Sequence, residues 1–344
     1  MQKEKKYFAS GNSEKGFVSY YNEIYGGLNM VYIIKGGSGT GKSSFIRTIA
    51  DAGEARGYSV EYFYCSSDPL SLDGIIIEEL KTAVIDGTSP HNYDPKYPGV
   101  KDVILNFGDH WDSTKLKDKG QDICSLIDRK SVLYNNVYNY LAAAGRVEAE
   151  LKLCNQKAVL FEKMEAAVQR LGKGWKTGSG FKKILRPVDG ISHAGHITYG
   201  TYHLMAENRY VISDRYGIGC IFMEFLMGIA RKKELKTVYS PCFLDVNSIC
   251  AIYLPEVSTS FVITDDDGFE KTINMDRFVD VDIIRRNKQK NRFARRCLNS
   301  LYEGVQKGFD EIYELHSRLE KCYIGAMDFS KNTSLAQEII KEIF

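Results

Sequence analysis

The residues with the clearest chemistry lie between positions 36 and 44, where the sequence reads GGSGTGKSS. Residues 36–43 fit the pattern G-x-x-x-x-G-K-[ST], in which glycines let backbone N–H groups turn toward phosphate oxygens. Lys42 would reach the β- and γ-phosphates of a nucleotide, and the Ser43 hydroxyl would bind Mg²⁺. The sequence therefore predicts a site for ATP and Mg²⁺ formed by Gly36, Gly37, Ser38, Gly39, Thr40, Gly41, Lys42, Ser43 and Ser44.

A magnesium site of this kind also needs a carboxylate close to the glycine loop. Asp86 closes the apolar run 82–86, and Asp68 follows the strand-like run 60–65. Either carboxylate could hold the metal directly or through water, and each could instead be an ordinary turn or cap residue. His91 follows in a proline-rich segment and could position a water, contact a substrate or be an ordinary loop residue. We predict Lys42, Asp86 and His91 as catalytic residues, and Ser43, Asp86 and Asp68 as metal ligands.

The loop must be held between a buried strand and a helix. Residues 31–34 read VYII, which is typical of a parallel strand buried on both faces. Apolar residues recur at helical spacing over 45–50, directly after the loop. The order of strand, loop and helix predicts the α/β fold class, with P-loop NTPase-like domains in tandem, parallel sheets flanked by helices, and long helical arms.

The tandem arrangement is predicted by a second stretch, residues 209–230, that aligns with residues 31–50. Gly217 and Gly219 align with Gly39 and Gly41. Later segments match in the same order with a drifting offset, as a duplication with loop deletions would leave. The prediction is a first domain over 1–175, with the intact loop and a helical arm at about 112–171. A degenerate second domain is predicted over 176–344, with a helical segment at about 281–320.

The second copy lacks the residues that would do chemistry: Asp214, Cys220 and Ile221 replace Gly36, Lys42 and Ser43. Asp68 is retained there as Asp245, whereas Asp86 aligns with Ile263. A two-residue gap would instead match Asp86 with one of residues 265–267. Residues that the second copy has lost are better candidates for a chemical role than residues it has kept. The comparison therefore favours Asp86 over Asp68 as the metal-side carboxylate. It also predicts a single active site, in the first copy.

The helical segments could also bind a partner or contribute residues to the site. A basic run over 285–296 could be a charged helix surface, bind an anionic partner, or donate an arginine to the first loop. Residues 323–329 are predicted as a last strand before a closing helix. The arms could also bind a protein partner.

Composition limits the class of protein. Lys plus Arg number 46 and Asp plus Glu 44, so the formal net charge of +2 does not support nucleic-acid binding. No apolar run has the length of a membrane span, and we expect a cytoplasmic protein. The eight cysteines form no C-x-x-C pair, so neither a zinc ribbon nor a thioredoxin-like site is predicted, and we expect reduced core residues.

The chain resembles a little-characterised family of bacterial tandem P-loop ATPase-like proteins. Four segments carry the resemblance: KGGSGTGKSS, CSSDPLSLDGIIIEEL, AVIDGTSPHNYDPKYPG and FVSYYNEIYGGLNMVYIIKGG. The resemblance covers nearly the whole chain and implies nucleotide binding through residues 36–43, without indicating a substrate. It makes Asp68, Asp86 and His91 motif members of unassigned role.

Three functions fit these observations. The leading hypothesis is a Mg²⁺-dependent ATP hydrolase whose helical arms respond to turnover. The alternatives are a kinase that transfers the γ-phosphate to a small molecule or nucleotide, and a non-catalytic, nucleotide-dependent switch. The sequence has neither the N-K-x-D element of GTP-specific proteins nor the L-S-G-G signature of ABC-type ATPases.

Overall fold

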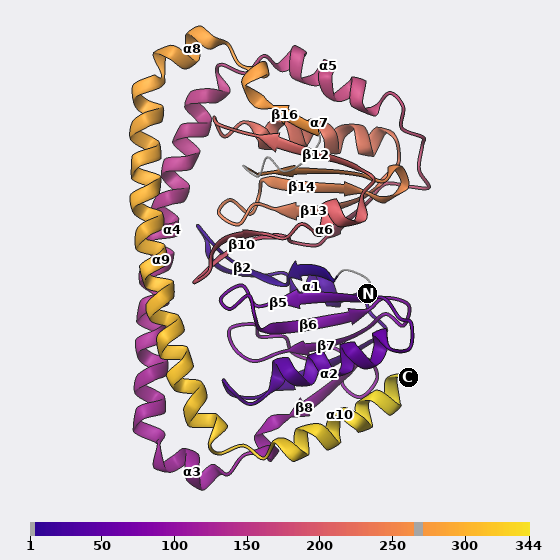
Figure 1. Cartoon of the computed structure of the whole chain (residues 1–344), viewed down its shortest axis with the longest axis vertical. Coiled ribbons are helices and arrows are strands. Elements are labelled where there is room, and N and C mark those ends of the chain that lie inside the picture. Colours follow the sequence, from indigo (N-terminus) through magenta and orange to yellow (C-terminus); the bar gives the residue numbers. More distant parts are fainter. Residues whose placement is uncertain (1–3, 265–270) are drawn as a thin grey trace.

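The computed structural model describes residues 4–264 and 271–344, which form two six-stranded α/β units placed one above the other (Figure 1). The first sheet has the order β1 (Lys5–Phe8), β5 (Val60–Tyr64), β6 (Leu72–Ile77), β7 (Thr82–Asp86), β4 (Met30–Lys35) and β8 (Asp102–Asn106). The second has the order β9 (Lys182–Leu185), β13 (Lys236–Pro241), β14 (Ile249–Leu254), β15 (Thr259–Ile263), β12 (Asn208–Ser213) and β16 (Lys271–Asn274). The mixed α/β class is confirmed, and each sheet repeats the other strand for strand.

The sheets are mostly parallel but not entirely so, which corrects the predicted all-parallel arrangement. β6 runs antiparallel to both of its neighbours, and β14 does the same in the second sheet. Each follows the preceding strand after a turn of a few residues, which is too short for a parallel crossover. Both sheets also carry a register shift at the equivalent place, between Phe63 and Tyr64 and between Ser240 and Pro241.

The connecting helices and hairpins repeat in the same way. The first half contains β2 (Ser10–Ser13), β3 (Gly16–Ser19), α1 (Tyr21–Tyr25), α2 (Lys42–Glu54), η1 (Phe107–His110), α3 (Ser113–Asp118), α4 (Gly120–Gln156) and α5 (Phe161–Gly172). The second contains β10 (Asp189–Ser192), β11 (Gly195–Thr198), α6 (Thr201–Met205), α7 (Gly219–Lys232), η2 (Pro255–Val257), η3 (Met275–Phe278), α8 (Val281–Arg286), α9 (Lys288–Ile324) and α10 (Phe329–Ile343).

The two long helices, α4 and α9, are each 37 residues long and run antiparallel along one side of both units (Figure 1). Val137, Leu141 and Ala144 of α4 share an apolar cluster with Val305 and Phe309 of α9. The predicted arms are therefore confirmed as helices, and each copy's arm packs against the other's. None of the helices in the described residues is both long enough and apolar enough to span a bilayer.

At their ends the arms cross between the units. After α4, α5 packs on α7 of the second unit; after α9, α10 packs on α2 of the first. Each α/β unit therefore contains segments from both predicted halves, 1–175 and 176–344. Residues 323–324 belong to α9 and residues 325–328 form a turn with one isolated bridge, so the predicted strand over 323–329 is wrong, whereas the closing helix is confirmed.

Three apolar clusters organise the layers. Tyr25, Ile33 and Phe63 of the first unit share one cluster with Val188 and Tyr202 of the second, so a common core lies between the sheets. A second cluster packs α2 and α10 on the outer face of the first sheet, and a third packs α5 and α7 on the second. All eight cysteines are free, but the expectation that they lie in the core is wrong for most of them: only Cys250 is buried, and Cys124 is exposed.

Candidate functional site

The glycine loop joins β4 to α2 and has the backbone that its sequence predicts. Gly39 and Gly41 have φ values of +71° and +84°, in the left-handed region that favours glycine. Gly41 precedes α2, and no side chain among the described residues caps that helix. The first backbone N–H groups of α2 therefore face the loop, at the end of the helix that attracts anions.

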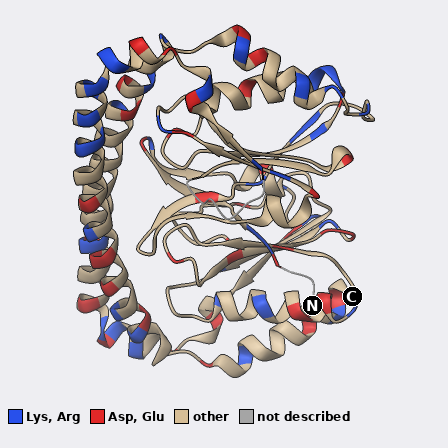
Figure 2. Cartoon of the chain, turned by 45° about the horizontal axis from the view of Figure 1, so that its top comes forward, with Lys and Arg blue, Asp and Glu red and all other residues tan. Residues whose placement is uncertain are grey.

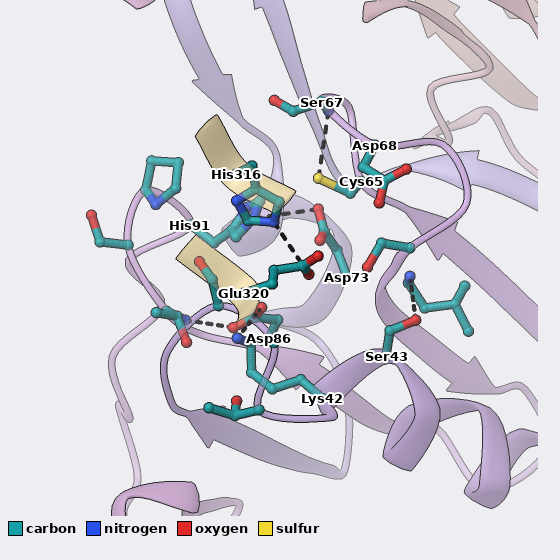
Figure 3. A pocket seen from close by; sticks show the side chains of 18 of the residues that line it. Lys42, Ser43, Cys65, Ser67, Asp68, Asp73, Asp86, His91, His316 and Glu320 are labelled. Atoms are coloured by element: carbon teal, nitrogen blue, oxygen red, sulfur yellow. Dashed lines mark hydrogen bonds and ion pairs between the residues drawn. The ribbon is translucent and has the colours of Figure 1, made fainter. Parts of the chain in front are cut away.

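Three side chains predicted for the site meet beside this loop (Figure 3). Lys42 donates a hydrogen bond of 2.6 Å to the Gly37 carbonyl oxygen, and its Nζ lies 3.4 Å from Oδ2 of Asp86. Asp86 stands at the end of β7, which pairs with β4. Ser43 Oγ accepts a 2.9 Å hydrogen bond from the backbone N–H of Leu72. A lysine, a hydroxyl and a carboxylate thus surround the helix terminus, as a metal-bound phosphate site requires.

The strand register also supports the alignment of Asp86 with Ile263. Asp86 pairs with Ile34 in the first sheet, and Ile263 pairs with Ile212, the counterpart of Ile34, in the second. The alternative match lay in residues 265–267, which are outside the described residues.

Asp68 and His91 line the same cavity but have different surroundings. Asp68 caps its own turn by accepting a 3.2 Å hydrogen bond from the Leu70 N–H, and its Oδ1 lies 3.7 Å from Nε2 of His193. The His91 ring is only 8% exposed and stacks on Tyr21, with 5.3 Å between the ring centroids. Asp86 makes a turn contact of the same kind, because its Oδ1 accepts a 2.8 Å hydrogen bond from the Thr88 N–H. Asp86 differs from Asp68 in lying beside Lys42, and His91 is in a largely buried position.

His91 faces Asp73, a residue that the sequence reasoning missed. The Asp73 side chain is 4% exposed, and its Oδ2 lies 3.4 Å from Nε2 of His91. Burial raises the pKa of Asp73 to about 6, and the nearby His91 acts in the opposite direction. Burial also raises the pKa of the adjacent Cys65 thiol. The available signal was the single carboxylate in the otherwise apolar strand LDGIII.

The opposite wall of the cavity comes from the arms. The cavity has a volume of about 460 Å³, within the range of about 300–1,000 Å³ typical of small-molecule sites. A Cβ at Gly39 would lie 2.8 Å from the Glu320 carbonyl oxygen, so α9 approaches the loop closely. A hydrogen bond with His316 lowers the pKa of Glu320, and Lys42 contributes in the same direction. Asn332 of α10 donates a 2.8 Å hydrogen bond to the Thr40 carbonyl oxygen. The spacing of residues in the sequence did not indicate that α9 and α10 would pack against the glycine loop.

The equivalent loop of the second copy, residues 214–221, is filled from within. Asp214 accepts hydrogen bonds from the backbone N–H groups of Tyr216 (3.0 Å), Ile218 (3.1 Å) and Gly219 (2.6 Å). Gly217 keeps the φ of +71° found at Gly39. The turn has therefore survived, but a carboxylate of the chain takes the N–H groups that an anion would use.

The basic run over 285–296 spans the end of α8 and the N-terminal part of α9, beside the second unit (Figure 2). Arg295 donates a hydrogen bond to the Arg215 carbonyl oxygen there. No arginine occurs among the described residues that line the cavity at the first loop. The hypothesis that this run donates an arginine to the first loop is therefore wrong, while an anionic partner stays a prediction.

Comparisons with known proteins do not extend these observations. No protein-family model matches the chain, and no curated protein or solved structure matches it either. The resemblance to tandem P-loop ATPase-like proteins therefore stays a prediction.

Proposed function

We propose that the chain binds ATP with Mg²⁺ at residues 36–43 and hydrolyses it at this one site. The observation that carries the proposal is the cavity beside the loop, which brings Lys42, Ser43 and Asp86 to the N-terminus of α2. Hydroxyl and carboxylate oxygens are the ligands that Mg²⁺ prefers, so Ser43 and Asp86 suit this ion. The ion would neutralise charge on the phosphates.

In this proposal the side chains mainly position and neutralise, as phosphoryl transfer requires. Lys42 exchanges the Gly37 carbonyl for the β- and γ-phosphates, and the N–H groups of the loop hold their oxygens. Asp86 and Glu320 border the cavity from β7 and α9, so a water between them can be oriented toward the γ-phosphorus. The water oxygen forms the new P–O bond as the bond from the γ-phosphorus to the ADP oxygen breaks; one water proton stays on the phosphate and the other is released to solvent.

The position of Glu320 links nucleotide binding to the arms. Its carboxylate is attracted to Lys42 when no phosphate is bound. A triphosphate would bind Lys42 and repel the Glu320 carboxylate. Nucleotide binding is therefore expected to shift the end of α9, which is the response to turnover predicted for the arms.

A kinase is the second candidate, because the cavity continues past the loop. Thr88, Ser89 and His91 line it on one side, and Tyr134, Phe309 and Tyr313 add aromatic surface on another. This wall offers room for a nucleobase or for a phosphate acceptor. The proline-rich segment that follows Asp86 and contains His91 therefore borders the cavity.

The test follows the γ-phosphate of labelled ATP with Mg²⁺, in the absence and presence of a small-molecule cell extract. Hydrolysis predicts free phosphate from ATP alone, lost in Lys42→Ala and retained in Cys220→Ala, the matched change in the second copy. Label that moves to a small molecule only with extract would indicate a kinase. If ATP binds but its γ-phosphate is neither released nor transferred in either condition, the non-catalytic, nucleotide-dependent switch is the remaining function. If ATP does not bind, the proposal is refuted.

A further inference from the structure

A second group of potential metal ligands lies in the same cavity, away from Ser43 and Asp86. One ligand atom each from Cys65, Asp73 and His91 lies within 4.8 Å of the others (Figure 3). Thiolate, carboxylate and imidazole together are a typical ligand set for zinc and similar transition metals. Bound ligands would be separated by about 3.3–3.7 Å in tetrahedral geometry. Asp73 Oδ2 and His91 Nε2 already lie 3.4 Å apart, so only a pair near the 4.8 Å limit would have to close, by about 1 Å.

The surroundings of Asp73 provide an independent observation. Its side chain is 4% exposed, and Oδ2, which faces the His91 ring, has no hydrogen-bond partner among the described residues. A buried carboxylate oxygen without a donor is costly unless a cation or proton compensates it. Nε2 of His91 lies 3.4 Å from this oxygen, and the neutral form of a histidine ring can bind a metal.

Cys65 lies beside this carboxylate. Its Sγ accepts a hydrogen bond of 3.4 Å from the backbone N–H of Ser67. Burial and the nearby Asp73 carboxylate raise the pKa of the free thiol, and a bound cation would favour the thiolate that metal binding requires.

We propose that Cys65, Asp73 and His91 bind one divalent transition-metal ion of the zinc class. Three protein ligands leave the fourth position of a tetrahedral site open, which is the arrangement of catalytic rather than structural zinc. Cys65, Asp73 and His91 line the same cavity as Lys42 and Ser43, so an open position on the ion could accept a water or a phosphate oxygen there. Metal binding here does not require the proposed ATP hydrolysis.

The second copy provides a competing site and therefore a control. Cys242 and Cys250 occupy the positions of Cys65 and Asp73, and Cys220 Sγ lies 3.9 Å from Cys242 Sγ. The Cys250 thiol donates a 3.2 Å hydrogen bond to the Pro241 carbonyl oxygen, which suits a protonated thiol. We therefore expect the metal in the first copy.

The test titrates the chelator-treated full chain with Co²⁺, whose bonds to thiolates give near-ultraviolet charge-transfer absorption. The expected result is one ion per chain with this band. Cys65→Ser should abolish the band, whereas Cys124→Ser, at an exposed cysteine of α4, and Cys242→Ser should keep it. Asp73→Asn and His91→Gln should weaken binding at least about 100-fold, because even outer partners of metal ligands contribute about 10–100-fold.

Three results would overturn the proposal: no band at large excess of Co²⁺, a band that survives Cys65→Ser, or a band lost in Cys242→Ser. If Cys65→Ser does not fold, the melting temperature decides instead, since Zn²⁺ should raise it in the wild type but not in Asp73→Asn. Lys42→Ala should keep the cobalt band while losing ATP, so a failure of this site and a failure of the proposed ATPase give different results.

Discussion

The two copies contain the same loop in two states. In the first, residues 38–44 border a cavity, and Lys42 donates a hydrogen bond back to the Gly37 carbonyl oxygen. In the second, the Asp214 carboxylate takes three backbone N–H groups of the equivalent turn. One substitution, glycine to aspartate at the start of the loop, supplies the chain's own anion. The comparison shows that the same glycine turn can be filled by a carboxylate of the chain and keep its backbone conformation.

The arms extend the contrast, because each reaches the loop of the other copy. Glu320 of α9 lies against Gly39, and Lys152, its counterpart on α4, lies against Gly217. Lys152 also forms ion pairs with Glu148 and Asp245, at 2.9 Å and 3.6 Å. The carboxylate of Glu320 thus lies beside the loop that contains Lys42. The amine of Lys152 lies beside the loop that contains Asp214. Each arm carries the charge opposite to that of the loop it reaches.

The largest effect is expected from giving the first loop the second loop's anion. Gly36→Asp should place a carboxylate on the N–H groups and lower ATP affinity by roughly 1,000-fold, because several charge-assisted hydrogen bonds of about 1.5–3 kcal/mol are lost. Isothermal titration calorimetry measures the change. Gly36→Ala is the control for added bulk, and equal affinity in the two variants would show that the carboxylate does not block the loop.

The next effect separates the two metal-side candidates. Asp86→Asn should reduce Mg²⁺-dependent phosphate release about 100-fold, since it removes an anionic ligand of the proposed Mg²⁺ ion. Asp68→Asn should change release by less than about 3-fold, because Asp68 caps a turn that the second copy keeps with Asp245. Steady-state phosphate release at saturating ATP provides the rates. The opposite ranking would transfer the role to Asp68.

A smaller effect is expected on the second loop, where the role of the carboxylate is structural. Asp214→Ala should lower the free energy of unfolding by about 2–3 kcal/mol, because three N–H groups lose their acceptor. ATP affinity should not change. Urea unfolding followed by circular dichroism measures the loss, and Asp214→Asn should recover part of it. A midpoint equal to the wild type would mean that the carboxylate does not hold this loop.

The smallest effect concerns the crossing of α10 onto the first unit. Asn332→Ala removes a buried hydrogen bond to the Thr40 carbonyl oxygen and should lower unfolding free energy by about 1–2 kcal/mol. Thr333→Ala, at the next and exposed position of α10, should cost less than about 0.5 kcal/mol. Equal losses of unfolding free energy in the two variants would show that the Asn332–Thr40 hydrogen bond does not hold α10 against the glycine loop.

The sequence predicted the features that depend on neighbouring residues. The loop, the strand ending at Asp86 and the helix after Lys42 follow from local pattern, and the duplication follows from matches in order. The antiparallel β6 was missed because an apolar run does not show strand direction. Asp73 was missed because its partner His91 comes from a distant segment. The approach of Glu320 and Asn332 depends on the crossing of the arms, which no local spacing encodes.

The central claim is that only the first loop holds a nucleotide. Calorimetric titration of the full chain with a non-hydrolysable ATP analogue and Mg²⁺ counts the sites directly. One nucleotide per chain is predicted for the wild type and for Cys220→Ala, and none for Lys42→Ala at the same concentrations. Two nucleotides per wild-type chain, or undiminished binding by Lys42→Ala, would contradict the account.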